Sequence, residues 1–222
     1  MKRIFIVLFL TILTAPAAFS QSRYIPLGMN GTVTNVSSTF GSSDFRSAQV
    51  AAGYGVGGRL DLNLEGGVLV EELDGITEVI PNFSFGFKMV MIKQQRAVPF
   101  SLVAGIRVGF ASALPENREI FGTNFGFNML VCRDFWIREK FLIGINGAFI
   151  YDRYRFDITN NSTDPATVSE SRLHHLRFGP ALDVGIRYFE DNLLVLRGDF
   201  LWDQEGSFTT RVNLILVIPT TR

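Results

Sequence analysis

The two histidines of the chain are adjacent, and they are its best candidates for catalysis. His174 and His175 follow a polar segment that contains Ser169 and Ser171, and Asp157 lies upstream of both serines. A histidine between a serine and a carboxylate can activate the serine hydroxyl for hydrolysis. Neighbouring strand residues point to opposite faces, so the two imidazoles are poorly placed to bind one metal ion. No nucleophile motif surrounds the serines. A hydrolase with a site near His175 is therefore an alternative, and we favour a histidine pair that orders a loop or an interface.

Two further motifs have a functional and a structural interpretation. Gly53–Gly58 matches the dinucleotide fingerprint G-x-G-x-x-G, but that fingerprint requires a helix to follow, and an alternating strand begins at Leu60. A tight hairpin turn explains the glycines better. Glu71, Glu72 and Asp74 offer oxygen ligands for a divalent cation, but their spacing is not that of a calcium loop, so we interpret them as a solvated acidic loop. We therefore expect no catalytic residue, no cofactor and no metal site.

The composition excludes several classes of protein. Of the 222 residues, 47% are hydrophobic and 21 are Phe, which is enough apolar material for one large domain and too much for a disordered chain. The 21 Lys and Arg residues balance the 21 Asp and Glu residues, which argues against a nucleic-acid binder. The single cysteine, Cys132, cannot form an internal disulfide, and no zinc-binding spacing is present in the sequence.

The first twenty residues have the order of a secretory signal peptide. Lys2 and Arg3 precede an apolar run that begins at Ile4, and small residues follow up to Ser20. The run is too short to cross a bilayer as a helix. We therefore expect residues 1–20 to be removed and residues 21–222 to form one domain.

The rest of the chain alternates between apolar and polar residues with the period of a β-strand. Residues 60–65 read Leu-Asp-Leu-Asn-Leu-Glu, and residues 83–87 read Phe-Ser-Phe-Gly-Phe. The same alternation recurs along the chain and predicts about ten strands, near residues 31–40, 46–56, 59–70, 79–92, 99–111, 121–132, 140–156, 173–188, 193–203 and 207–218. The first segment is rich in Thr and Ser and alternates poorly, so eight strands with a loose N-terminal arm are the fallback.

The size of the side chains indicates which face of these strands points outward. One face carries Phe, Leu, Ile and Val on nearly every strand, and the other carries mostly small and polar residues with a few charges. A secreted soluble barrel would turn the bulky face inward, but that face is too bulky to fill the inside of a small barrel. The bulky face must therefore point into lipid. The sequence predicts an all-β fold, a transmembrane antiparallel up-and-down β-barrel.

The alternation of the two strand faces places a set of charged residues on the inward face, in the lumen. Folding each strand back on the next brings Asp183 close to Arg197, and Asp199 close to Arg211. Such charges must be paired, because an unpaired charge in a narrow lumen is costly. The predicted lumen charge network consists of Glu65, Lys88, Arg107, Asp183, Arg187, Arg197, Asp199 and Arg211.

The connections between the predicted strands alternate between short and long. The longest one, Asp157 to Arg172, falls on the side that a bacterial outer-membrane barrel would turn toward the outside. Its Thr, Asn, Ser and Asp content suits polar contacts with surface partners. The residues of this candidate surface loop are Asp157, Asn160, Asn161, Asp164, Glu170 and Arg172.

The signal peptide, the alternating strands at residues 59–65 and 83–87, and the alternation of short and long connections resemble the small outer-membrane β-barrel proteins of Gram-negative bacteria. The resemblance covers residues 21–222 and is architectural. It implies an integral protein of the bacterial outer membrane, in contact with outer-membrane lipid and lipopolysaccharide and inserted by the barrel-insertion machinery. Many such barrels end in an aromatic residue, whereas this chain ends in Pro219-Thr220-Thr221-Arg222.

A barrel of this size has an interior that side chains fill, so it cannot serve as a general diffusion pore. We therefore expect a non-enzymatic barrel that serves envelope structure, adhesion or surface recognition by binding an unknown surface ligand through its outer loops, without a nucleic-acid partner. A narrow channel or a secretion or assembly component is the alternative.

Overall fold

A computed structural model describes residues 22–41, 46–73, 75–161, 166–189 and 191–220 of the protein. The predicted signal peptide, residues 1–20, and Asp164 lie outside the described residues. A single turn of 3-10 helix, η1 (Ser22–Tyr24), precedes the strands. The strands are β1 (Asn30–Gly41), β2 (Arg46–Val56), β3 (Leu60–Leu73), β4 (Ile76–Ile92), β5 (Ser101–Ala113), β6 (Arg118–Ile137), β7 (Phe141–Asn160), β8 (Thr167–Tyr188), β9 (Asn192–Asp203) and β10 (Phe208–Thr220).

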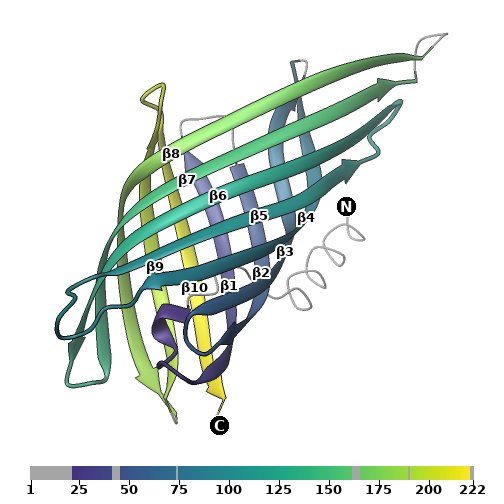
Figure 1. Ribbon diagram of the computed structural model, residues 1–222. Coiled ribbons are helices and arrows are strands. Elements are labelled where there is room, and N and C mark those ends of the chain that lie inside the picture. Colours follow the sequence, from purple (N-terminus) through teal and green to yellow (C-terminus); the bar gives the residue numbers. More distant parts are fainter. Residues whose placement is uncertain (1–21, 42–45, 74, 162–165, 190, 221–222) are drawn as a thin grey trace.

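The ten strands form one closed antiparallel barrel. Each strand pairs with its neighbours in the chain, and β1 closes the barrel by pairing with β10 (Figure 1). The predicted fold class and the count of ten are confirmed. The polar segment Asn30–Gly41 is part of the wall and not a loose arm, because it pairs along its length with β10. Within the described residues, no helix is long and apolar enough to cross a membrane.

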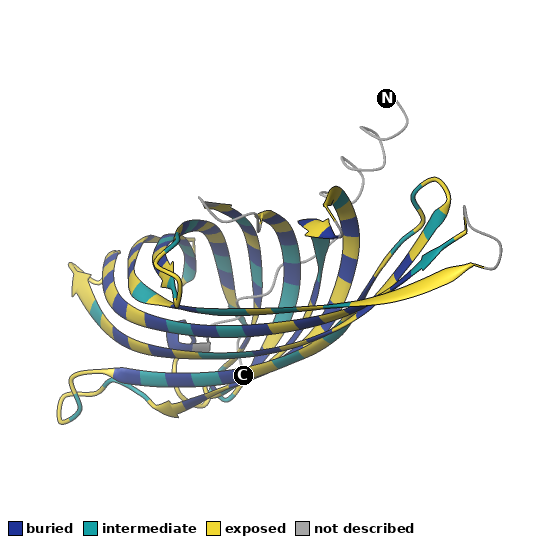
Figure 2. Ribbon diagram, turned by 90° about the horizontal axis from the view of Figure 1, so that it is seen from above, coloured by how far each residue is buried: buried dark blue, intermediate teal, exposed yellow. Residues whose placement is uncertain are grey.

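Burial alternates along the strands as the sequence predicts. Phe83 and Phe85 are exposed on the outer wall, whereas Ser84 and Lys88 are buried in the lumen. Figure 2 shows the same alternation as stripes of buried and exposed residues around the wall. The bulky apolar face therefore points outward and the small and polar face inward, as the size of the side chains requires.

The turn between β2 and β3 settles the interpretation of the glycine motif. Gly57 and Gly58 have φ angles of +61° and +64°, and β3 follows at once in place of a helix. Positive φ is the conformation that glycine tolerates best. A Cβ atom at Gly58 would also lie 2.5 Å from the carbonyl oxygen of Pro26. The motif is therefore a tight hairpin turn against which the N-terminal segment packs.

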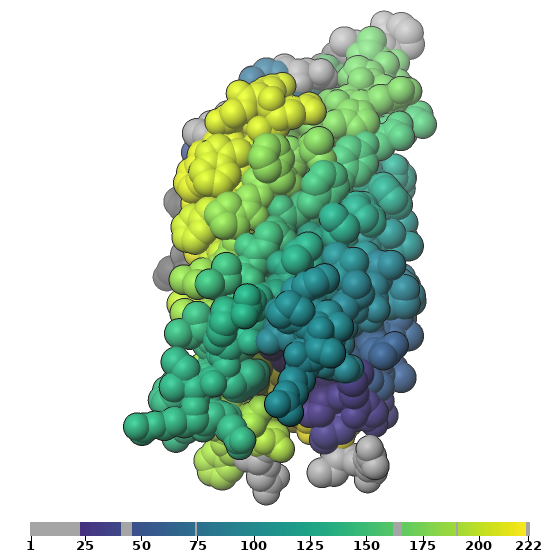
Figure 3. Space-filling view, turned by 60° about the vertical axis from the view of Figure 1, so that its left-hand side comes forward, coloured from purple at the N-terminus to yellow at the C-terminus, as the bar shows by residue number. Residues whose placement is uncertain are grey.

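Three neighbouring strands extend well beyond the rest of the wall. β6, β7 and β8 have 20, 20 and 22 residues, about twice the 9–11 that a tilted strand needs to cross a bilayer. In Figures 1 and 3 the green strands β7 and β8 continue past the neighbouring strands to a tip. We call residues 118–125 of β6, 153–160 of β7 and 167–174 of β8, which pair with one another, the strand extension.

The strand extension corrects the prediction of a long surface loop. Residues 157–160 belong to β7 and residues 167–172 to β8, and they pair in register from Asp157 with Glu170 to Asn160 with Thr167. The physical reason is that cross-strand hydrogen bonds satisfy the backbone of an exposed strand as well as water does. A polar composition therefore does not distinguish a loop from a strand that continues into water.

Candidate functional site

A short N-terminal segment closes one mouth of the barrel. Residues 22–29, which we call the N-terminal plug, begin with η1 and lie at the end of the barrel where β10 ends (Figure 1). The side chain of Ile25 is fully buried, in a cluster with Leu142, Val195 and Ile215. The described part of the plug therefore fills the lumen with apolar contacts at this end.

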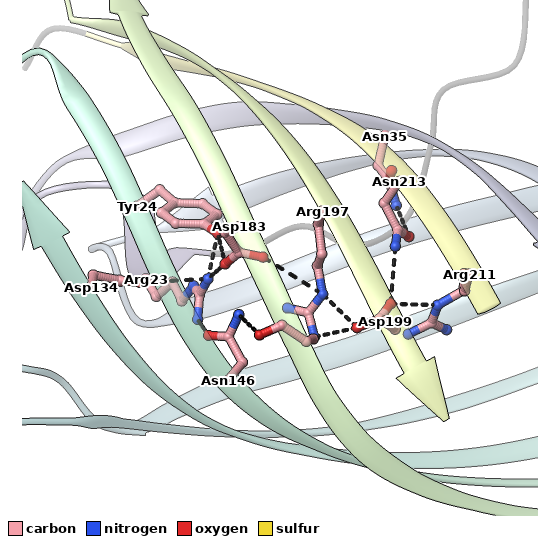
Figure 4. Close-up of polar contacts among 11 residues, drawn as sticks. Arg23, Tyr24, Asn35, Asp134, Asn146, Asp183, Arg197, Asp199, Arg211 and Asn213 are labelled. Atoms are coloured by element: carbon pink, nitrogen blue, oxygen red, sulfur yellow. Dashed lines mark hydrogen bonds and ion pairs between the residues drawn. The ribbon is translucent and has the colours of Figure 1, made fainter. Parts of the chain in front are cut away.

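Polar contacts hold the plug against the opposite wall. The Arg23 guanidinium forms an ion pair with Asp183 and donates a hydrogen bond of 2.7 Å to Oδ1 of Asn146. The Tyr24 hydroxyl donates a hydrogen bond of 2.6 Å to the same carboxylate of Asp183 (Figure 4). Burial raises the pKa of the Tyr24 hydroxyl above its ordinary value, so this group keeps the proton that it donates.

A chain of ion pairs continues from Asp183 across the lumen. Arg197 lies 3.9 Å from Asp183 and 2.6 Å from Asp199. Arg211 donates a hydrogen bond of 2.8 Å from Nε to Asp199, and Asn213 donates another of 3.0 Å (Figure 4). The structure therefore brings together both predicted pairs, because Asp183 faces Arg197 and Asp199 faces Arg211 in the strand register.

A second cluster lies on the side of the lumen formed by β3–β8. Arg107 contacts Glu65 at 2.7 Å and Asp152 at 2.5 Å, and Arg177 contacts Asp152 at 2.6 Å. Lys88 is buried and is the register partner of Asp61. The space enclosed among the lumen charges near Arg107 and Arg211 has a volume of about 20 Å³. A space of this size holds a single water molecule.

Arg187 does not join this network. Its side chain is 36% exposed and lies 3.7 Å from Asp191 in the turn after β8. Its guanidinium also lies 4.6 Å from the centre of the Trp136 ring. Parity places Arg187 on the inner side, but its position near the end of β8 places it at the rim, where solvent reaches it.

The sequence analysis missed several residues of the network. Arg23 and Tyr24 precede the first strand, so no alternation marks them. Asp152 is the register partner of His175, and the inward residues of β7 beside it, Ile150 and Tyr154, are largely apolar. The strict inward parity of Arg177 was a usable signal, whereas Asp152 lacked one until the register of β7 was known.

Lys93 fastens the plug to the wall from outside the strands. Its ammonium group donates hydrogen bonds to the carbonyl oxygens of Ile25 and Gly58, the second at 3.1 Å. Burial lowers the pKa of Lys93 to about 8, although Asp61 opposes the shift. Burial therefore disfavours the charged ammonium form of Lys93 at this site. The neutral amine can still donate hydrogen bonds to both carbonyl oxygens.

We expect the barrel to become more stable as the pH rises from 7.5 to 9.5. In this interval the folded protein binds fewer protons at Lys93 than the unfolded protein, whose lysine keeps its ordinary pKa, so the free energy of unfolding increases with pH. The measurement is the urea unfolding midpoint of the detergent-solubilised barrel against pH. The Lys93→Gln variant should lose part of the rise, and an identical slope in both proteins would contradict the assignment.

The structure separates the residues of the hydrolase alternative. His175 and Asp157 lie on opposite faces of the sheet, since His175 faces the lumen side with Asp152 while Asp157 lies on the outer wall with Glu170. Ser171 and Ser169 are four and six residues from His175 along β8, which is about 13 and 20 Å in a strand. Nε2 of His175 instead lies 3.6 Å from Oε1 of the buried Glu71. The predicted combination of serine, histidine and Asp157 is therefore not assembled.

The predicted surface-loop residues lie mostly on the strand extension. Asp157, Glu170 and Arg172 face outward, and Arg155 lies 3.2 Å from Glu170, which also contacts Arg172. Asn160 ends β7, and the amide of Asn161 donates a hydrogen bond of 2.8 Å to the carbonyl oxygen of Asn117 in the β5–β6 turn. The extension thus carries paired charges on its outer face.

Comparison with known proteins supports the fold class. No family model matches the chain. No curated protein matches it either. Among solved structures, the chain is similar to the translocator domain of the autotransporter NalP from Neisseria meningitidis, with a TM-score of 0.51 and 8% identity over 86% of this chain and 88% of that one.

Two weaker likenesses are also to membrane barrels. The outer membrane protease OmpT from Escherichia coli gives a TM-score of 0.41 and 12% identity over 86% of this chain and 92% of that one. The CymD monoaromatic hydrocarbon channel gives a TM-score of 0.32 and 5% identity over 92% of this chain and 91% of that one. The likeness to the translocator domain, at 8% identity, shows the fold alone, which is a closed antiparallel β-barrel of the outer-membrane type.

Proposed function

We propose that the protein is a non-enzymatic barrel of the bacterial outer membrane that does not conduct solutes and acts at the cell surface through its strand extension. The observation that carries the proposal is the filling of the lumen by side chains. An apolar cluster with the plug lies at one end, a second cluster around Leu69, Ile80 and Phe156 lies toward the other, and ion pairs lie between them. The space enclosed among the lumen charges near Arg107 and Arg211 is about 20 Å³, which is too small for a solute larger than water.

The outer wall supports the membrane location. The outward residues of β7 are apolar or Gly from Phe141 to Tyr151, and charges begin at Arg153. An eleven-residue stretch of this kind matches the length of a tilted membrane-crossing strand. The strand extension lies beyond that stretch, so its paired strands are not needed to cross the membrane. They are available to bind a partner.

The proposal is tested with the purified full-length barrel on gels and in planar bilayers. On gels, we expect unheated samples to give a band of altered mobility, because closed barrels resist detergent until heated. In planar bilayers, we expect no discrete conductance steps. Conductance steps that disappear on replacing Arg107 with Ala would overturn the proposal in favour of a narrow channel.

The surface role has its own test. Deleting residues 157–160 together with 167–170 removes segments of β7 and β8 that pair with each other in register. Because four residues are removed from each strand, the remaining side chains keep their inward or outward orientation. We expect the shortened barrel to keep its heat-modifiable mobility and cells that express it to lose adhesion to one another. Unchanged adhesion would remove the extension from the function.

A hydrolase is the competing function, because Nε2 of His175 lies 3.6 Å from Oε1 of Glu71. We expect the purified barrel to cleave neither lipid esters nor unstructured peptides. An activity that is abolished by His175→Ala, in a variant that keeps its heat-modifiable mobility, would establish the enzyme instead.

A further inference from the structure

One strand of the strand extension has an open edge. β8 begins at Thr167, but its pairing with β9 begins only at Arg177, which lies opposite Asp203. Residues 170–174 of β8 therefore pair with β7 on one side, and no described strand pairs with them on the other side. In Figure 1, β8 forms the margin of the extension, and β9 ends well short of the tip. We call residues 170–174 the open edge.

The open edge is accessible to another strand. All five of its residues are exposed or half-buried, whereas Arg177, further along β8, is buried. Figure 2 shows that the extension projects beyond the ring of the barrel. Proteins often protect an exposed strand edge with a proline or a bulge, but residues 170–174 contain no proline and pair with β7 without a break in register. The backbone groups of such an edge can add a further strand by main-chain hydrogen bonds.

The charges of the open edge are poorly matched to those of β7. Arg172 lies directly opposite Arg155 in the register, and Glu170 lies opposite Asp157. Like charges that lie directly opposite each other destabilise a sheet. A diagonal contact compensates in part, because Arg155 lies 3.2 Å from Glu170. A strand added on the open side could give Glu170 and Arg172 the directly opposite partners that β7 does not offer.

A second copy of the open edge offers charges in the required order. Two antiparallel copies related by a two-fold axis perpendicular to the sheet keep their outward residues on the same face. With the axis at Ser171, Glu170 of each copy lies opposite Arg172 of the other. An axis at Glu170 or at Arg172 would instead place like charges opposite each other. The charges therefore select one register, which is centred on Ser171.

The rest of the outward face of the extension does not repel a second copy. The numbers of cationic and anionic side chains on this face are equal, so its formal charge is zero. The three arginines are Arg153, Arg155 and Arg172, and the three carboxylates are Glu119, Asp157 and Glu170. Two identical faces of this kind can therefore approach each other without a net repulsion.

We propose that two copies of this chain pair through the open edge of β8, antiparallel and centred on Ser171. Because the two β8 strands run in opposite directions, the two barrels also point in opposite directions, as barrels do in the outer membranes of two facing cells. This inference rests on the proposed surface function and names its partner, which is a second copy of the chain on another cell.

Cysteine replacement tests the register in the purified full-length barrel in detergent. The background variant is Cys132→Ser, which removes the single native cysteine. In this background, Ser171→Cys should form a disulfide-linked dimer on oxidation with copper phenanthroline, because directly opposite Cβ atoms are close enough for a disulfide. Ser169→Cys is the matched control, since its two copies lie four residues apart along the pair, about 13 Å. Equal cross-linking at both positions, or none at Ser171→Cys, would overturn the proposal.

Charge reversal tests whether a second copy is the partner. Glu170→Arg and Arg172→Glu should each weaken dimerisation about tenfold, because each variant places like charges opposite each other at two symmetric positions. An equimolar mixture of the two variants should dimerise again, since every arginine of the pair then faces a glutamate. The measurement is sedimentation velocity in detergent, and gel mobility of unheated samples shows that each variant is folded. Variants that stay monomeric when mixed would contradict the proposal.

Cells that express the two variants separate this inference from the proposed function. Cells that carry either variant alone should lose adhesion to one another, and a mixture of the two populations should adhere. If the deletion of residues 157–160 and 167–170 abolishes adhesion but the mixed populations do not adhere, the surface function stands with another partner and this inference is wrong. If the purified barrels dimerise in the expected register but the deletion leaves adhesion unchanged, the pairing stands and the surface function is wrong.

Discussion

Replacing Asp199 with asparagine is expected to lower the free energy of unfolding by about 3–5 kcal/mol, the range seen when one partner of a buried ion pair is removed. The Asp199 side chain is fully buried and receives contacts from Arg197 at 2.6 Å and Arg211 at 2.8 Å. Asparagine keeps the size of the side chain but removes the charge, so two buried guanidinium groups lose their common partner. The measurement is reversible urea unfolding of the barrel in lipid vesicles, followed by tryptophan fluorescence.

The control for this variant is a solvent-exposed aspartate of the same chain. Asp191 is 65% exposed and lies 3.7 Å from Arg187 at the rim, so Asp191→Asn should change stability by less than about 0.5 kcal/mol. A double-mutant cycle with Arg211→Met should give a coupling of about 1–3 kcal/mol. A coupling near zero would mean that the lumen charges are not the paired network described above.

Replacing Arg23 with alanine is expected to release the N-terminal plug and leave the barrel folded. The variant loses a buried ion pair with Asp183 and a hydrogen bond to Asn146, which together hold the plug with about 3 kcal/mol. The plug can leave the lumen without breaking any strand pair, so the loss appears as local opening.

Hydrogen exchange measures this opening at a single amide. The Gly28 amide donates a hydrogen bond of 3.1 Å to the carbonyl oxygen of Gly57, and its exchange should become about a hundredfold faster, which corresponds to about 3 kcal/mol. Exchange in β7 and β8 should not change. Arg187→Ala, which removes an arginine at the same end of the barrel but outside the network, is the matched control. If Gly28 exchanges at the original rate in Arg23→Ala, the contacts of Arg23 do not hold the plug, and Tyr24, Ile25 and Lys93 hold it without them.

The sequence by itself determined the wall of the barrel. Alternation is a local property, so segments such as residues 60–65 predicted both their strands and the face that points outward. The sizes of Phe83 and Phe85 then excluded an inward orientation, and the structure agrees. Pairings such as Asp199 with Arg211 followed from the order of the strands, because the short β9–β10 turn fixes the register.

Only the tertiary structure decided how the lumen is closed and where the strands end. The plug begins with a single 3-10 turn and has no periodic pattern, and Arg23 contacts Asp183, which lies 160 residues away in the sequence. Asp157 and Glu170 have a polarity that suits a loop as well as a strand in water, so pairing alone makes them part of β7 and β8. Arg187 has the parity of a lumen residue, but its height in the barrel makes it a rim residue. Parity is fixed by neighbours in the chain, whereas closure and height depend on contacts that form only when distant strands are brought together.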